Sequence, residues 1–313
     1  MQIDPALRAL WGDPASQRLA QEHMLKTREA WKATDDVAAI LEDLEAFGRG
    51  GNFADYPALA ALFEPDRAEA FVRDFLTTMC AGLRDTHLGQ MPFRHSYSDG
   101  YAVMHLARAG RATLALVTLE CGSRPAANSI AFTDCERVEI ILQGHATGAV
   151  VSRDGAGALA RSTRSFTVGD CDWFDSVSAR LIETVDRSLV SLRLSRNAER
   201  PGQSTEYALD DGRVLHRSAG NPEDSRHELM ATVLGAMGRA DAAPALIVVA
   251  LSEVAAPLRW QALRQALALD AMAGIKALGE IAARQGDPLI GPSQALRKQL
   301  VQDYPQLAMG EAA

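Results

Sequence analysis

Two histidines and a carboxylate near position 100 come nearest to a metal-ligand set in this 313-residue chain. His95, Asp99 and His105 supply the ligand types found in many non-haem iron oxygenases, so they could hold Fe(II) or another divalent metal. The same segment is also typical of a turn before a strand, in which Asp and His make local hydrogen bonds. The turn is the favoured interpretation, and the metal-dependent oxygenase or hydroxylase is the alternative.

His145 is a further residue that could take part in chemistry or contact a ligand. It follows Gly144 at the end of a β-prone run, and because imidazole titrates near neutral pH it could act as an acid or base at a rim. A role in the turn is the simpler interpretation. In the metal alternative, His145 or Glu120 could replace one ligand.

These residues lie in the middle of three regions with different patterns. Residues 1–91 show helical spacing, as in Val37, Ile40, Leu44 and Phe47, and predict a helical N-terminal region. Residues 92–221 contain short β-prone runs, among them the separate runs 138–142 and 149–152, with tight-turn pairs such as Asp99-Gly100 between runs, which predicts an all-β sandwich or barrel. The candidate residues therefore belong to a region of strands.

Residues 222–313 return to the helical pattern. Pro244, Pro257 and Pro292 lie where helices can begin, since a missing N–H costs little in the first turn. The segment Leu258–Leu263, followed by Leu278, Gly279 and Asp287-Pro288, weakly resembles HEAT-like repeats, in which stacked helix pairs share an apolar face. A plain helical bundle explains the same spacing. In both arrangements, the surface of these helices could contact a protein partner.

Four β-prone runs in the central region occur in the order of a cupin (RmlC-like) domain. They are Ala115–Gly122, Val138–Gly144, Phe166–Asp170 and Leu189–Leu194. The resemblance covers about 85 residues and implies an α+β protein with a central cupin-like antiparallel β-sandwich between helical regions. In that family two motifs rich in histidine supply the ligands of a metal.

Counting along those two motifs places other residue types at the metal-ligand positions. Arg137 falls at the glutamate position and Thr133 at a histidine position of the first motif, and Arg180 falls at the histidine position of the second. Guanidinium groups do not bind a metal cation, so the resemblance implies a cupin-like scaffold without the usual metal. If Arg137 and Arg180 face inward, they would favour an anion. Alternatively, they face outward or pair with nearby carboxylates such as Glu139.

Composition sets the remaining expectations. The formal charge of −8 argues against a broad nucleic-acid or anionic-membrane surface, and no segment has the pattern of a signal peptide or a membrane span. The four cysteines form no Cys-x-x-Cys pair, which favours a reduced, cytoplasmic setting. We therefore expect a ligand-binding or accessory protein that recognises a small anionic molecule or an acidic peptide through Arg137, Arg180, Thr133 and His145, with a homodimer as a possible assembly. Whether it is an enzyme stays open.

Overall fold

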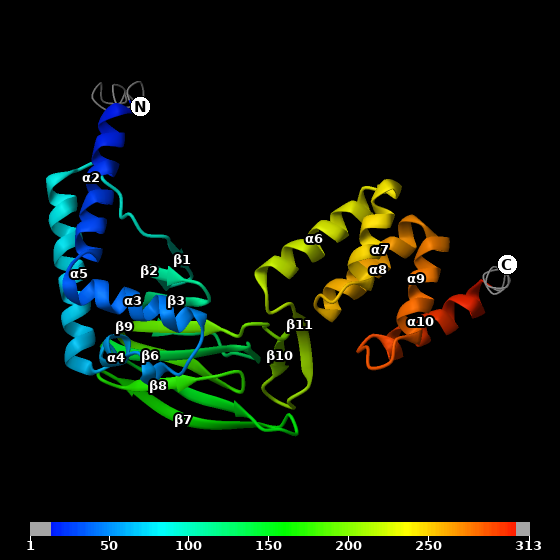
Figure 1. The fold of residues 1–313 in the computed structure, drawn as a ribbon. Coiled ribbons are helices and arrows are strands. Elements are labelled where there is room, and N and C mark those ends of the chain that lie inside the picture. Colours follow the sequence, from blue (N-terminus) through cyan, green and yellow to red (C-terminus); the bar gives the residue numbers. More distant parts are fainter. Residues whose placement is uncertain (1–13, 305–313) are drawn as a thin grey trace, which may run out of the picture. The chain divides into compact units, whose positions relative to one another are not determined.

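The computed structural model describes residues 14–304 and divides into two compact units (Figure 1). The first contains the chain up to Glu199 together with Tyr207–Arg213, and the second contains Arg200–Glu206 and the chain from Val214 onward. Antiparallel strands occupy the middle of the sequence and helices occupy both ends. This confirms the predicted α+β class, with antiparallel strands between two helical regions in the sequence.

The N-terminal helices and the central strands share one core within the first unit. The helical elements are α2 (Ala15–Lys32), α3 (Asp35–Arg49), the short η1 (Phe53–Asp55), α4 (Pro57–Ala61) and α5 (Pro65–Asp85). The predicted apolar positions are buried, including Ile40 and Phe47 of α3 and Phe75 and Met79 of α5. They pack with strand residues such as Leu114. The helices therefore cover one face of the sheet.

Eight strands of the first unit form one large antiparallel sheet. They are β1 (His95–Ser98), β2 (Tyr101–Ala109), β3 (Ala112–Leu119), β4 (Gly122–Ser123), β6 (Cys135–Arg153), β7 (Leu159–Thr167), β8 (Cys171–Phe174) and β9 (Ser178–Asn197). Strand β5 (Ser129–Phe132) is not part of this sheet. The large sheet has the order β1-β2-β3-β9-β6-β7, with β4 beside β9 and β8 beside β6. Strands β10 (Ser204–Ala208) and β11 (Val214–Ser218) follow where the two units meet in the sequence.

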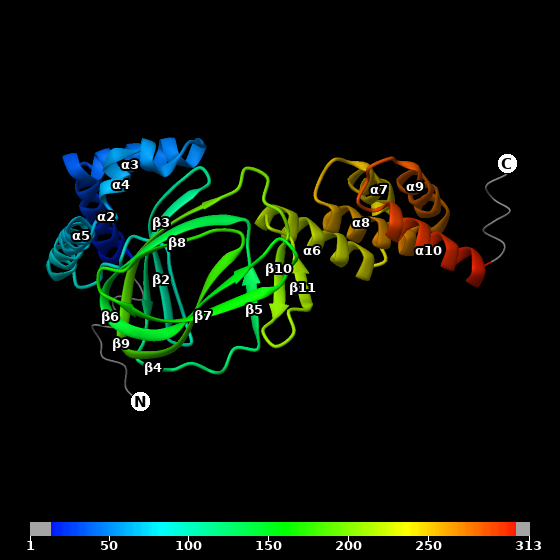
Figure 2. The same ribbon diagram turned by 90° about the horizontal axis from the view of Figure 1, so that it is seen from below.

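Two long bent strands, β6 and β9, build both layers of this sheet (Figure 2). The first half of β6 pairs with the second half of β9 in one layer, and their other halves pair in the second layer. The pairing is irregular around Gly144, whose φ of +95° favours glycine and whose Cβ would meet the carbonyl oxygen of Arg187 at 2.6 Å. The bend thus depends on a residue without a side chain.

Two sequence predictions about this sheet were wrong. The runs 138–142 and 149–152, predicted as separate strands, are parts of the single strand β6, because the chain bends at Gly144 without leaving the sheet. The expected closed barrel is also not found, since β1 and β7 end the hydrogen-bonded order of the large sheet within residues 14–304. The two layers are halves of one folded, open sheet.

The second unit is helical from Pro222 onward. Its elements are α6 (Pro222–Ala236), the short η2 (Ala240–Ala242), α7 (Ala243–Leu251), α8 (Ala256–Leu269), α9 (Ala271–Ala283) and α10 (Ile290–Asp303). Leu246, Leu263, Leu278 and Ile281 are buried in its core, which confirms the predicted helical spacing. No helix within residues 14–304 is long and apolar enough to cross a membrane.

Candidate functional site

A pocket of about 350 Å³ lies between the ends of four strands of the first unit. Arg137 comes from the start of β6, Phe174 from the end of β8, and Arg180 from the start of β9. Thr133, in the turn between β5 and β6, lies at the same pocket. Three of the four residues predicted to bind a ligand, Thr133, Arg137 and Arg180, are therefore brought together. We call this the arginine pocket.

Strand alternation explains why charged side chains gather beside this pocket. Successive residues of a strand point to opposite faces of the sheet. Val138 and Ile140 of β6 pack in the core that contains the helices, so the alternate residues Arg137 and Glu139 face the other way. Leu192 and Leu194 of β9 enter the same core, which turns Ser191 and Arg193 toward Glu139.

Glu139 is the centre of a buried polar cluster, with a side chain that has no exposed surface. Its Oε1 accepts hydrogen bonds from Arg180 Nη2 and Ser191 Oγ, each at 2.5 Å, and its Oε2 accepts one from Arg193 Nε at 3.1 Å. Arg193 Nη1 also donates to the hydroxyl of Tyr101 at 2.8 Å. Because Glu139 and Arg180 lie in opposite layers, their ion pair joins the two halves of the folded sheet.

The ionisation of Glu139 is set by its arginine neighbours. Burial alone would raise the pKa of this carboxyl, but the charges of Arg193 and Arg180 and the hydrogen bond from Ser191 outweigh it and lower the pKa from 4.5 to about 2. Glu139 is therefore an anion at neutral pH. It provides one negative charge to the cluster.

Arg137 has no such partner among the described residues. Its guanidinium lies over the ring of Phe174, 4.9 Å from the centroid, and its Nε is buried without a hydrogen-bond acceptor. Burial, and then repulsion by Arg193 and Arg180, lowers the pKa of Arg137, although Glu139 acts in the opposite direction. Nη1 of Arg180 is also buried without an acceptor. Three guanidinium groups thus lie around one buried carboxylate, which pairs with Arg180 and Arg193.

The predicted pairing of the two arginines with carboxylates holds for one of them. Arg180 faces inward and pairs with Glu139, whereas no carboxylate in the described chain pairs with Arg137. Sequence reasoning did not single out Arg193 and Ser191 as parts of the site. The sequence pattern that could have indicated them is the two-residue spacing within strands, which places Arg137 and Glu139 on one face of β6 and Ser191 and Arg193 on one face of β9.

His145 lies outside the arginine pocket. Its Nδ1 is 2.5 Å from Asp186 Oδ2, and the two residues join β6 and β9 beyond the bend. The side chain of His145 is 37% exposed. The structure therefore places His145 with a carboxylate at the surface and not with Thr133, Arg137 and Arg180.

The predicted metal ligands do not form a metal-binding group. His95 Nδ1 lies 2.9 Å from the carbonyl oxygen of Phe93, and Asp99 occupies the β1–β2 turn with a φ of +51°. Burial is the largest cause that lowers the pKa of His105, and the nearby charges of Arg94 and Arg108 lower it further. Within residues 14–304, no three His, Cys, Asp or Glu side chains meet in a metal-binding arrangement. These residues do not fit the metal site of the alternative interpretation.

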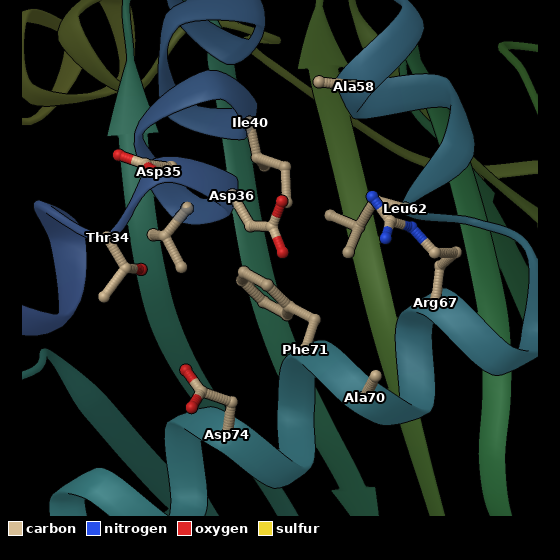
Figure 3. Close-up of a pocket in the computed structure, with 11 residues that line it drawn as sticks. Thr34, Asp35, Asp36, Ile40, Ala58, Leu62, Arg67, Ala70, Phe71 and Asp74 are labelled. Atoms are coloured by element: carbon tan, nitrogen blue, oxygen red, sulfur yellow. The ribbon is translucent and has the colours of Figure 1, made fainter.

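A larger hollow of about 510 Å³ lies among the N-terminal helices (Figure 3). The side chains of Asp36 from α3 and Phe71 from α5 project into it, and Asp74 and Arg67 lie at its edge. Asp35 and Asp36 belong to the first turn of α3, where negative charge stabilises the helix dipole. None of the lining residues has a buried polar atom without a partner. The carboxylates therefore have a structural role at the helix start.

Comparison with known proteins gives only partial structural matches. No family model and no curated protein matches the chain. Similar solved structures include an oxalate decarboxylase from Bacillus subtilis (TM-score 0.27, 15% identity, covering 34% of this chain and 28% of that one). A sugar phosphate isomerase from a cupin superfamily of Silicibacter pomeroyi matches with a TM-score of 0.24 and 16% identity, over 38% of this chain and 78% of that one.

A 7S globulin from Momordica charantia also matches, with a TM-score of 0.28 and 14% identity over 37% of this chain and 35% of that one. The chain covers less than a third of the length of the oxalate decarboxylase. Such matches assign no activity. The proposals below rest on the residues of this chain.

Proposed function

We propose that the first unit is a binding module that holds a small anionic molecule in the arginine pocket without using a metal. The observation that carries the proposal is the partly buried guanidinium of Arg137, whose buried Nε has no acceptor and which has no carboxylate partner in the described chain. Burying a charge is costly unless it is paired and hydrogen-bonded. An anion in the pocket would supply the missing partner.

The balance of charges indicates the kind of anion. Arg137, Arg180 and Arg193 carry three positive charges against two negative ones, from the buried Glu139 and from Asp175 at the rim of the pocket, which leaves one. Asp175 at the rim uses Oδ1 to accept hydrogen bonds from Val177 N and Ser178 Oγ, at 3.0 and 2.7 Å, within its own turn. A carboxylate or phosphate compound would therefore match the net positive charge of the cluster.

The size and donors of the pocket support a small molecule over an acidic peptide. A volume of about 350 Å³ lies at the small end of ligand sites. Arg137 offers Nε and Arg180 offers Nη1, and guanidinium groups bind carboxylate and phosphate oxygens through charge-assisted hydrogen bonds. The hydroxyl of Thr133 adds a neutral donor at the mouth. This donor set suits an oxyanion and not a metal cation.

Isothermal titration calorimetry with a panel of mono- and dicarboxylates and phosphate compounds would test this function. We expect at least one of these anions to bind the full chain and Arg137→Met to weaken its binding by about tenfold or more, because a charge-assisted hydrogen bond contributes roughly 1.5–3 kcal/mol. Arg213→Met is the matched control, since Arg213 is exposed and pairs only with Asp211. Unchanged binding in Arg137→Met would refute the assignment of this pocket.

A second candidate function concerns the helical unit, which we propose to be a protein-contact surface for a second copy of the chain. Leu229, Met230, Val233 and Met237 on and just after α6 are 46–64% exposed and lie on neighbouring turns. Successive helices α7 to α9 share one core, in keeping with HEAT-like stacking. Sedimentation velocity should show an association that Leu229→Glu and Met237→Glu together abolish. A chain that stays monomeric at high concentration would contradict this.

A further inference from the structure

A second, strongly basic pocket of about 270 Å³ lies where α2 meets the edge of the sheet. Its charged lining comes from α2, from the segment before β1 and from β2, and we call it the basic pocket. The residues that define it are Arg28, Lys32, Arg94, His105, Arg108 and Thr113. No carboxylate lines it, although the whole chain carries a formal charge of −8. Positively charged side chains are therefore concentrated in this pocket, although the chain as a whole is negatively charged.

The backbone of β2 is modified in a way that brings two basic residues to this pocket. His105 and Arg108 are three residues apart, so in a regular strand they would point to opposite faces. The pairing of β2 with β3 shifts between His105 and Ala107, and such a bulge redirects the following side chains. Both residues consequently line the same hollow.

Helix α2 supplies the opposite wall. Arg28 and Lys32 are four residues apart and lie on one face of the helix. Arg28 Nη1 donates to the carbonyl oxygen of Pro92 at 3.0 Å, which fixes the helix side of the pocket to the segment that carries Arg94. The walls are thus held together independently of any ligand.

The charges in the basic pocket are only partly neutralised. Glu29 pairs with Arg28 at 2.7 Å and approaches Lys32 at 3.9 Å. No carboxylate of residues 14–304 pairs with Arg94 or Arg108. Burial and then repulsion by Arg94 and Arg108 lower the pKa of His105, which is the effect expected in a positive potential.

We infer that the basic pocket binds the phosphate group of a small molecule or inorganic phosphate itself. Four permanent cations and the hydroxyl of Thr113 surround a hollow of suitable size, and a tetrahedral oxyanion can accept hydrogen bonds from several of these donors at once. This site is separate from the arginine pocket. The inference does not depend on the function proposed for that pocket.

Calorimetric titration of inorganic phosphate into the full-length Arg137→Met protein, at constant ionic strength, tests the inference with the other pocket disabled. We expect saturable binding that weakens roughly tenfold or more in a variant that also carries Arg94→Gln and Arg108→Gln. Both arginines are exposed, so the replacements should not affect folding. Arg213→Gln, at an exposed arginine elsewhere in the unit, is the matched control and should leave binding unchanged.

Nuclear magnetic resonance of the wild-type protein provides a second measurement that does not rely on Arg137→Met. Bound phosphate should raise the pKa of the His105 imidazole, whose signal is assigned with His105→Gln. A sugar phosphate in place of inorganic phosphate would distinguish a phosphomonoester from the free ion by its tighter binding. Phosphate binding that survives Arg94→Gln and Arg108→Gln, or a His105 signal that chloride shifts equally, would overturn the inference.

Discussion

Replacing Glu139 with glutamine should destabilise the first unit strongly, because it removes the buried negative charge that lies beside three guanidinium groups. The side chain keeps its size and its position between Arg180, Arg193 and Ser191. What changes is the charge, so the positive groups repel one another without compensation. Breaking a buried ion pair from one side is far more costly than removing an exposed one.

The size of the expected loss of stability follows from the lowered pKa of Glu139. Its pKa of about 2, compared with an ordinary value of 4.5, corresponds to about 3 kcal/mol of preference for the carboxylate in the folded protein at 1.36 kcal/mol per pH unit. Because the folded pKa is the lower one, this contribution is fully present above about pH 4.5. It is lost as the pH falls from there toward 2. We expect Glu139→Gln to cost about 3 kcal/mol at pH 7.

Urea denaturation followed by tryptophan fluorescence can measure this loss. A Trp260→Phe background removes the tryptophan of the second unit, so the signal reports the first unit alone. Glu183→Gln is the matched control, because Glu183 forms an exposed ion pair with Arg161 in the same sheet and should cost less than about 1 kcal/mol.

A Glu139→Gln protein as stable as the Glu183→Gln control at pH 7 would refute the account of the buried cluster. So would a stability difference that stays constant from pH 6 down to pH 3, since the carboxyl of Glu139 takes up a proton in the unfolded chain in that range while it stays ionised in the folded protein. In addition, phosphate or a dicarboxylate should stabilise Glu139→Gln more than the unchanged protein, because the variant has one more uncompensated positive charge.

The remaining predictions concern the bend, the helical unit and the turn before β2. Gly144→Ala should lower the free energy of unfolding by about 2 kcal/mol or more, because a side chain is strained at φ +95° and meets the carbonyl of Arg187. Gly155→Ala is the control, because Gly155 lies in an open turn and its replacement should be nearly neutral. Thermal denaturation of the two variants would compare these effects. Arg259→Met should lower the free energy of unfolding of the second unit by about 3 kcal/mol, since it leaves the buried Asp287 unpaired. Amide hydrogen exchange should show the lost protection in α7 to α9. His95→Gln should leave the metal content of purified protein unchanged, and a stoichiometric metal that this variant loses would restore the metal interpretation.

Part of the site could be predicted because spacing along a strand is local information. Counting along the cupin-like motifs placed Thr133, Arg137 and Arg180 at ligand positions, and the structure brings all three to one pocket. The inward direction of Arg137 follows from the apolar residues on either side of Glu139, since strands alternate between a buried apolar face and its opposite.

The other part depends on how distant segments bend and pair. Glu139 meets Arg180 because β6 and β9 fold over at Gly144, and the sequence pattern does not specify that crossing. The same limitation explains the wrong prediction of two strands within β6. The alternative interpretation took His105 as a metal ligand because of its residue type, but a bulge in β2 places it among cations. Bulges and bends change which side chains meet without changing residue types.

Diffraction from crystals soaked in selenate would test the central claim most directly, because selenium in this tetrahedral dianion gives an anomalous signal. The account predicts a peak in the arginine pocket within hydrogen-bond distance of Arg137 Nε and Arg180 Nη1, and its loss in crystals of Arg137→Met. A peak confined to the basic pocket or to other surface arginines, with the arginine pocket empty at saturating selenate, would contradict it.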